Sequence, residues 1–263
     1  MKTDQINLVY FSATHTTKRV IKAVGQQFGG NISEYDITQT IPTSDIILGR
    51  EDLLIVGVPS YGGRIAAVSL PALQRFKGNG TPAIIVCVYG NREYDDALLE
   101  LKDIVEGNGF KVVSAGAFIA QHSIFPAVAK SRPDEKDMEQ IREFANASAH
   151  LLESVEDISV LPEISVKGKR PYKSAGSIPM KPKGDSKCNE CGTCVKQCPV
   201  GAISADAPQK TDKKKCISCG RCITVCPQKS RHFGGLMYKI AGGMFRKAFS
   251  ARKEPEVVYG LQV

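Results

Sequence analysis

Cysteine spacing is the feature that most constrains this chain. Eight of its nine cysteines fall in two runs of the form Cys-x2-Cys-x2-Cys-x3-Cys-Pro. The runs comprise Cys188, Cys191, Cys194 and Cys198, and then Cys216, Cys219, Cys222 and Cys226. Structural zinc sites usually pair two Cys-x2-Cys knuckles across a longer gap, and disulfides are rare inside cells. The spacing therefore predicts cubane iron–sulfur clusters, and the repetition predicts a pseudo-twofold unit.

This spacing is the pattern of bacterial two-cluster ferredoxins. Three closely spaced cysteines hold one cubane, and the fourth reaches across to the other cluster. We therefore expect one 4Fe–4S cluster on Cys188, Cys191, Cys194 and Cys226, and a second on Cys198, Cys216, Cys219 and Cys222. Crossing the ligands in this way would tie the two clusters into one rigid unit.

The chain before the cysteines alternates apolar β-type runs with segments of helical period. That alternation is typical of βαβ units and a mostly parallel sheet. Strands are expected at residues 6–11, 32–36, 52–58, 83–89 and 112–120. Helices are expected at residues 16–28, 67–77, 94–108 and 133–154. The predicted fold class is α/β, with a doubly wound five-stranded parallel sheet followed by a small α+β region.

Composition divides the chain into four parts. Residues 1–157 form the α/β domain, and residues 158–184 read as a linker because prolines recur there among Lys and Ser without periodicity. Residues 185–230 form the cluster region. Residues 231–263 form a C-terminal extension that we expect to pack on the α/β domain, since Gly234-Gly235 and Gly242-Gly243 would interrupt a helix.

A hydroxyl-rich turn follows the first predicted strand. It reads Ser12-Ala13-Thr14-His15-Thr16-Thr17 and opens a helix, so its side chains and amides can donate to a phosphate. In a doubly wound sheet of order 2-1-3-4-5, this turn lies at the switch point beside the loop after the third strand. A Ser/Thr turn by itself is more often a helix cap.

Two aromatic and glycine-rich loops are expected at the same edge of the sheet. The loop after the third strand contains Ser60, Tyr61, Gly62 and Gly63, and the loop after the fourth contains Tyr89, Gly90, Asn91 and Tyr94. Tyrosine can stack on a planar ring, and glycine lets backbone approach it. Tyr-Gly pairs are usually simple turns, yet three such signals at consecutive strand ends favour a bound flavin.

With these motifs in place, residues 1–155 resemble a flavodoxin, and the whole chain resembles the flavodoxin–ferredoxin fusion proteins of the EFR family. The resemblance implies FMN as a cofactor. It places the phosphate on Ser12, Thr14, His15, Thr16 and Thr17. It places the ring among Ser60, Tyr61, Gly62, Gly63, Tyr89, Gly90, Asn91 and Tyr94. The chain departs from the family at His15, where flavodoxins generally have glycine.

Charge and hydropathy bear on the partners. The formal charge is +8, but two oxidised clusters and an FMN phosphate would reduce it to roughly +2, so we expect no nucleic-acid partner. No run approaches the ~20 apolar residues that a membrane span needs, and the first residues lack a signal-peptide layout, so a cytoplasmic location is expected. Redox proteins are the expected partners. Lys213-Lys214-Lys215 could attract acidic ones, although a solvated turn is the simpler interpretation. An oligomer is compatible with the sequence.

Two further residues invite a chemical role. Cys87 lies within an apolar run, where a thiol is usually an inert core residue. His122 follows the fifth predicted strand and could relay a proton to a reduced ring or simply be a hydrogen-bonded loop residue.

Three functions remain open from the sequence. The first is an electron carrier in which FMN and two clusters exchange electrons. The second is a flavin-dependent oxidoreductase fed by the clusters, although no Gly-x-Gly-x-x-Gly fingerprint for NAD(P)H is present and no catalytic acid or base is identified. The third is a ferredoxin whose flavodoxin-like part lacks FMN and serves for docking.

Overall fold

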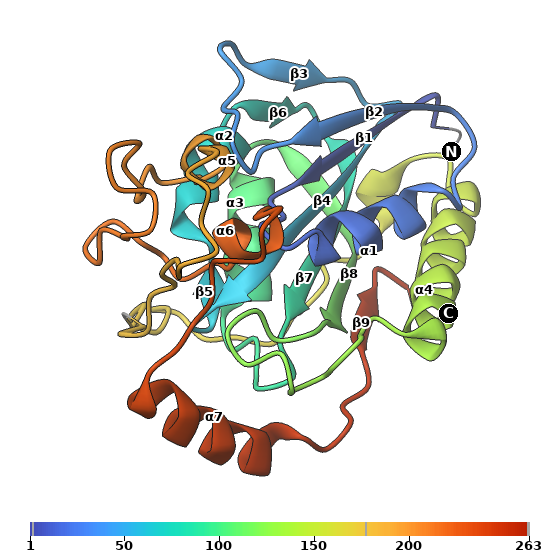
Figure 1. Ribbon diagram of the computed structural model, residues 1–263. Coiled ribbons are helices and arrows are strands. Elements are labelled where there is room, and N and C mark those ends of the chain that lie inside the picture. The colour runs from blue at the N-terminus through green and yellow to red at the C-terminus, as the bar shows by residue number, and fades with distance from the viewer. Residues whose placement is uncertain (2, 177, 262–263) are drawn as a thin grey trace.

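The α/β domain is built on a parallel sheet in a computed structural model that describes residues 1, 3–176 and 178–261 (Figure 1). Its five long strands are β1 (Gln5–Tyr10), β2 (Asn31–Asp36), β4 (Asp52–Tyr61), β7 (Thr81–Tyr89) and β8 (Phe110–Ile119). They lie in the order β2-β1-β4-β7-β8, and all four pairings are parallel. Counted along the chain, this is the order 2-1-3-4-5 of a doubly wound sheet, as predicted.

Helices cover both faces of this sheet (Figure 1). They are α1 (Thr16–Gly25), α2 (Leu70–Leu73), α3 (Ala97–Gly107) and α4 (Glu135–Glu153). Alternate residues of β1 divide between two cores: Ile6 and Leu8 pack with α1 and α4, whereas Val9 packs with α2 and α3. Because β1, β4, β7 and β8 are buried on both faces, they are nearly continuous apolar runs, whereas the edge strand β2 is largely exposed. Their carboxyl ends form one edge of the sheet, where the predicted flavin loops lie.

The segment predicted as a helix at residues 67–77 is α-helical over a single turn only. A 3₁₀ turn (η1, Ala67–Ser69) leads into the single turn of α2, and the chain then forms β6 (Phe76–Gly78). Strand β6 pairs in parallel with β3 (Ile46–Leu48), and Phe76 is 2% exposed. Burial of Phe76 and pairing with a strand distant in sequence override the local helical pattern.

The C-terminal extension returns to the α/β domain. Strand β9 (Glu256–Tyr259) pairs antiparallel with β8 and extends the sheet at that edge, and a two-residue strand, β5 (Arg64–Ile65), pairs antiparallel with β4. The extension also contains helix α7 (Leu236–Phe249), although paired glycines were expected to interrupt it. A Cβ atom on Gly242 would lie 3.3 Å from the ring of Phe125. The glycine thus lets the helix backbone approach that ring closely, and this packing offsets the low helix propensity of glycine.

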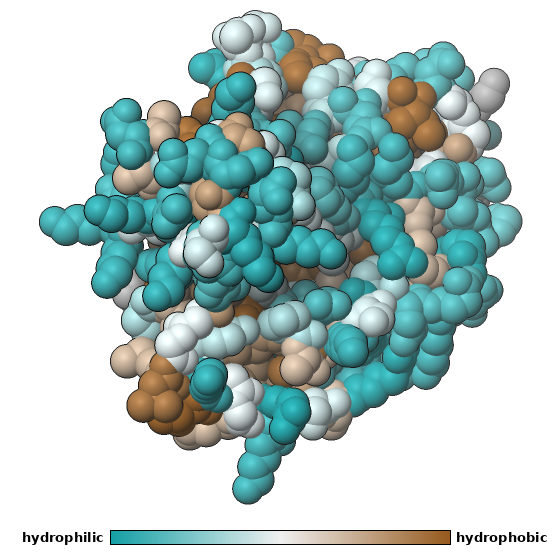
Figure 2. Space-filling view, in the orientation of Figure 1, coloured by the Kyte–Doolittle hydropathy of each residue, from teal (hydrophilic) through white to brown (hydrophobic). Residues whose placement is uncertain are grey.

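Helix α7 packs on one side only. Tyr238 stacks on Phe125 of the α/β domain, Phe245 packs against the same ring at a tilt, and the Tyr238 hydroxyl donates to the carbonyl of Ile124 at 2.9 Å. Four apolar side chains point outward, namely Leu236, Met237, Ile240 and Met244. Figure 2 shows a hydrophobic patch over this part of the molecule. In the described part of the chain, no helix is both long and apolar enough to cross a membrane.

The linker lies along α3. The backbone amides of Lys169 and Lys173 donate to the two carboxylate oxygens of Asp96, and Arg170 pairs with Asp103. After the linker come two single-turn helices, α5 (Thr193–Lys196) and α6 (Arg221–Thr224), and a further 3₁₀ turn, η2 (Ile158–Val160), follows α4. The linker contacts bring the cluster region back over the carboxyl edge of the sheet.

Candidate functional site

The two cysteine runs have the same backbone conformation. Positive φ angles occur at equivalent positions 28 residues apart, at Glu190 and Ser218 and again at Gly192 and Gly220. Sulfur contacts repeat as well: the amide of Ala202 donates to Cys198 Sγ at 3.3 Å, and the amide of Ser230 donates to Cys226 Sγ at 3.3 Å. Amide donors aimed at sulfur stabilise thiolates, as an iron–sulfur site requires.

One hollow is lined by the first predicted ligand set. Cys188, Cys191, Cys194 and Cys226 all face it, together with Pro208 and Arg231. Cys226 comes from the second run and the others from the first, so the structure brings together residues on the crossed pattern. Burial raises the pKa of the Cys194 thiol, whereas the Arg231 guanidinium lowers it.

The second predicted set also lies together. Burial raises the pKa of the Cys219 thiol to about 12, and the nearby Cys222, Cys198 and Cys216 add to that increase. Arg231 lowers the pKa of Cys222 as it does that of Cys194, so this guanidinium, 2% exposed, is shared by both groups. A bound cluster would keep such buried thiols deprotonated.

The cysteine groups are not arranged around a single ion. Within the described ranges, no set of three or more His, Cys, Asp and Glu side chains converges on a position that one metal ion could occupy. Zinc holds its thiolates at about 2.3 Å, which would bring their sulfurs nearly into contact. The prediction of 4Fe–4S clusters rests on the cysteine spacing in the sequence.

The turn after β1 has unused donors. Ser12 is held in place, because its amide donates to Thr38 Oγ1 at 2.8 Å and its hydroxyl accepts the amide of Lys18 at 3.0 Å. The amides of Thr14, Thr16 and Thr17 have no acceptor among the residues that the structure describes. His15 has a φ of 65°, the left-handed conformation that favours glycine. The start of α1 is thus shaped to receive an anion, and it fits a flavin phosphate.

The loop after β4 meets the cluster region. Gly62 and Gly63 have φ angles of 65° and 88°, and a Cβ atom on Gly63 would overlap the carboxylate of Asp95 at 2.1 Å, so only glycine fits there. Tyr61 packs edge-on against Phe11, and burial, with a smaller contribution from the nearby Cys219, raises the pKa of Tyr61 well above its ordinary value. Tyr61 therefore lies between the predicted flavin edge and the second cysteine group.

The loop after β7 contacts the C-terminal extension. Tyr89 and Tyr94 are 3% and 1% exposed, and the Tyr94 hydroxyl donates to Glu256 at 2.6 Å. The Asn91 amide donates to the carbonyls of Phe249 and Ala251 at 2.7 and 2.8 Å. Of the two loops predicted to surround a ring, the Ser60–Gly63 loop keeps exposed atoms at this edge. In the Tyr89–Tyr94 loop, the amide nitrogen of Asn91 and the hydroxyl of Tyr94 donate to the C-terminal extension.

His122 lies behind the second of these loops. Its Nδ1 accepts the amides of Ile124 and Phe125 at 3.2 and 3.1 Å, and its ring contacts Phe245. Burial lowers its pKa to about 4, and the nearby charge of Arg92 adds to the effect. The side chain is therefore a neutral loop residue at pH 7. Cys87 is fully buried in the core, and burial raises its pKa.

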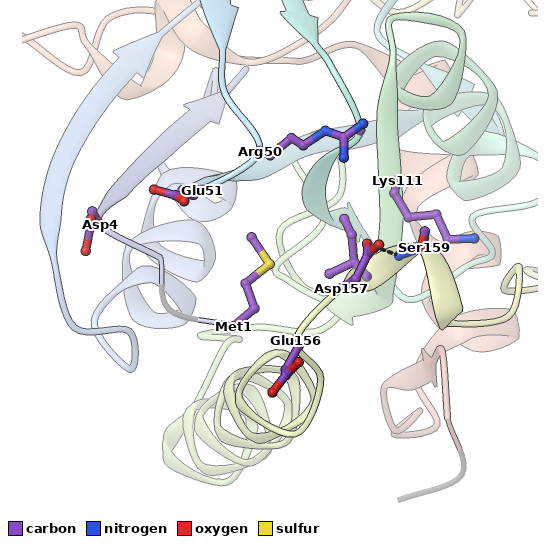
Figure 3. Close-up of a pocket in the computed structure, with 10 residues that line it drawn as sticks. Met1, Asp4, Arg50, Glu51, Lys111, Glu156, Asp157 and Ser159 are labelled. Carbon is purple, nitrogen blue, oxygen red and sulfur yellow. Dashed lines mark hydrogen bonds between the residues drawn. The ribbon is translucent and has the colours of Figure 1, made fainter.

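A separate hollow lies at the opposite edge, at the amino ends of the strands (Figure 3). Figure 3 shows acidic and basic side chains around it, among them Glu51, Glu156, Arg50 and Lys111, and Asp157 there accepts the amide of Ser159 at 2.8 Å. None of the predicted site residues lines it. The predicted chemistry is therefore confined to the carboxyl edge.

Comparison with known proteins identifies the C-terminal part. Residues 187–230 match the family described as "4Fe-4S dicluster domain". The chain therefore contains an iron–sulfur domain at these residues. Together with the doubly wound sheet, the match fits a fusion of a flavodoxin-like domain with a ferredoxin domain. No curated protein gives a significant sequence match.

Solved structures similar to this chain include flavoproteins. A flavodoxin from the domain Archaea has 13% identity over 57% of this chain and 99% of its own, with a TM-score of 0.42. A flavodoxin from Streptococcus pneumoniae TIGR4 has 19% identity over 56% and 98%, with a TM-score of 0.40. Rubredoxin oxygen:oxidoreductase from Desulfovibrio gigas has 17% identity over 58% of this chain, with a TM-score of 0.43, and the match spans 37% of that protein. The fold assignment rests on the sheet topology itself.

Proposed function

We propose that this protein carries electrons between FMN, bound at the carboxyl edge of the sheet, and two 4Fe–4S clusters, and passes them on to redox partners. The observation that supports this most is the packing of Tyr61 against the hydrophobic core that contains Cys219, because the predicted flavin loop and a predicted cluster ligand share that core. A flavin holds one or two electrons and a cluster one, so the pair would connect the two kinds of electron traffic.

Specific residues of this chain would hold each cofactor in position. Ser12 and the amides of Thr14, Thr16 and Thr17 would hold the phosphate, and the Ser60–Gly63 loop would contact the ring. Cys198, Cys216, Cys219 and Cys222 would hold the cluster beside it, and Cys188, Cys191, Cys194 and Cys226 the outer one. The expected partners are redox proteins that approach the outer cluster, and the cell interior is the expected location.

One observation favours a second candidate, a ferredoxin whose flavodoxin-like part lacks FMN. The side-chain amide nitrogen of Asn91 and the hydroxyl of Tyr94 donate to the C-terminal extension, whereas Asn91 Oδ1 has no partner among the described residues. In that case the α/β domain would serve as a rigid support for the clusters.

Quantitation of iron and flavin during an anaerobic reductive titration separates the two candidates. About eight irons and one FMN per chain, with coupled reduction of both, would support the combined carrier. About eight irons with no FMN, and no FMN uptake on reconstitution, would contradict it and favour the second candidate.

A further inference from the structure

Arg221 lies at the junction between the cluster region and the α/β domain. It follows Cys219 and Gly220 in the second cysteine run and begins α6. The residue is 7% exposed, so a permanent positive charge lies almost wholly inside the protein. Burying such a charge is costly unless an anion or several acceptors compensate it.

The acceptors around Arg221 are neutral and few. Nη2 donates to the side-chain oxygen of Gln197, and Nη1 lies 3.4 Å from the carbonyl oxygen of Ala13 and 3.5 Å from Nε2 of His15. Nε has no hydrogen-bond partner, and no described Asp or Glu forms an ion pair with this guanidinium. The protein therefore leaves the charge only partly compensated.

The guanidinium is directed at the turn whose amides are unused. The amides of Thr14, Thr16 and Thr17 have no acceptor in the described part of the chain, and they lie at the start of the ten-residue helix α1, where the helix dipole favours negative charge. Gly220 permits the approach, because a Cβ atom there would already lie 3.4 Å from Thr14 Cγ2. Unused donors from two distant parts of the chain thus meet at one place.

Other cations near the turn are already engaged. Lys18 pairs with Glu34 at 2.9 Å, and Arg19 Nη1 donates to the carbonyl of Pro133 at 2.8 Å. His15 is not a substitute, because burial, and then the charge of Arg221, lower its pKa and keep it neutral. Arg221 is therefore the side chain best placed to neutralise an anion at this turn.

We propose that Arg221 and the Ser12–Thr17 turn form a single binding site for a phosphate monoester, so that the cluster region completes the phosphate site of the α/β domain. The inference rests on the proposed function in that FMN would supply the phosphate. A guanidinium binds phosphate oxygens with two parallel donors, and the helix amides supply further ones.

The position of Arg221 also couples this site to the second cluster. Its backbone amide donates to the sulfur of Cys219, while its side chain reaches the turn. One residue thus contacts both a predicted cluster ligand and the anion site. By linkage, a phosphate bound at the turn strengthens docking of the cluster region, and docking strengthens phosphate binding.

The test measures dissociation constants of FMN, riboflavin and inorganic phosphate for the cluster-loaded full-length chain. Arg221→Gln should weaken FMN binding by roughly tenfold to a hundredfold, the effect of losing hydrogen bonds to a charged group, and should leave riboflavin binding unchanged. Arg221→Lys keeps the positive charge but loses the paired donors of the guanidinium, so we expect a smaller loss of FMN affinity. Lys18→Gln is the matched control, because that charge is already paired with Glu34, and FMN binding should change little.

The outcomes separate this inference from the proposed function. Tight FMN binding that Arg221→Gln does not change, or an equal loss of FMN and riboflavin, overturns the role of Arg221 and leaves the carrier function standing. Phosphate binding that Arg221→Gln abolishes, in a chain that takes up no FMN, supports the anion site and contradicts FMN as its ligand. Iron content is measured for each variant. If Arg221→Gln loses iron, the FMN affinity of Arg221→Lys is compared with that of the unchanged chain instead, and an unchanged affinity in that variant overturns the role of Arg221.

Discussion

The two cysteine groups share a sequence pattern and a backbone, yet they lie in different surroundings. Cys191 is exposed, and hydrogen bonds from Thr193 lower its pKa. Cys219, its counterpart in the second run, is 8% exposed and belongs to the hydrophobic core of the α/β domain, and burial raises its pKa. Equal motifs therefore need not have equal roles. The first group faces solvent, where a partner can approach, and the second faces the interior of the molecule.

Cysteine substitutions should give the largest difference between the groups. Cys219→Ala and Cys191→Ala should each remove about half of the bound iron, because each eliminates one ligand of one cluster. Only Cys219→Ala should also weaken the contact with the α/β domain, seen as faster hydrogen exchange in the Ser12–Thr17 turn. Equal exchange in the two variants would show that the groups do not differ in this way.

The glycines that begin α5 and α6 offer a matched pair. Gly192 and Gly220 have φ angles of 73° and 80°, so leucine at either position should cost about 1–2 kcal/mol in backbone strain. A side chain on Gly192 meets nothing within 4 Å, whereas one on Gly220 meets Thr14 and Ser123. Gly220→Leu should therefore be destabilising by about 1–3 kcal/mol more than Gly192→Leu in urea unfolding. Equal losses of unfolding free energy in the two variants would contradict a close contact between Gly220 and the residues Thr14 and Ser123.

Lowering the pH should destabilise the fold through His122. This residue precedes Ser123, which lies next to Gly220 where the cluster region meets the α/β domain. Its pKa is about 4 when folded and about 6.5 when unfolded, so the unfolded chain binds more protons between these values and stability falls as the pH falls. Between pH 7.5 and 5.5 the loss should be about 1.4 kcal/mol. In His122→Asn, whose side-chain oxygen can accept the same amides, this part of the loss should disappear in urea unfolding at the two pH values. An unchanged pH dependence would argue against a buried neutral His122.

The smallest expected effect concerns Glu190 and Ser218, which have the same φ of 57°. Glu190→Gly should stabilise the protein by up to about 1 kcal/mol by relieving the left-handed conformation. Ser218→Gly should be destabilising by a similar amount, because the Ser218 hydroxyl donates to the carbonyl of Met180 and accepts from Lys181. Shifts of the same sign in thermal unfolding would show that the two surroundings are more alike than the structure indicates.

Local patterns were enough to predict much of this structure. The long strands begin and end within three residues of their predicted bounds. For β1, β4, β7 and β8 the reason is that continuous apolar runs mark strands buried on both faces. The cysteine spacing also predicted the two ligand sets, which stay predictions, and Cys188, Cys191, Cys194 and Cys226 line one hollow. The strand bounds and the cysteine sets both depend on patterns within a short stretch of sequence.

Contacts between distant segments could not be predicted in that way. Phe76 in β6 pairs with Ile46 in β3, which lies 30 positions earlier in the sequence. The four residues of β9 carry no local signal for pairing with β8. Arg221 contacts Ala13 across 208 positions, and its place within a cysteine motif concealed it. The one available signal was the difference between Arg221 and its counterpart Thr193 in the first run.

Strand β9 has a consequence for how the cluster region is held. Because β8 precedes that region and β9 follows it, both flanks of the region are fixed to the same sheet. The region is therefore a tethered insertion, and its local concentration at the carboxyl edge is set by the length of the chain on either side, at a level that dilution of the protein does not change. Electron exchange across the junction would then be independent of protein concentration, whereas exchange through the outer cysteine group would depend on how often a partner arrives.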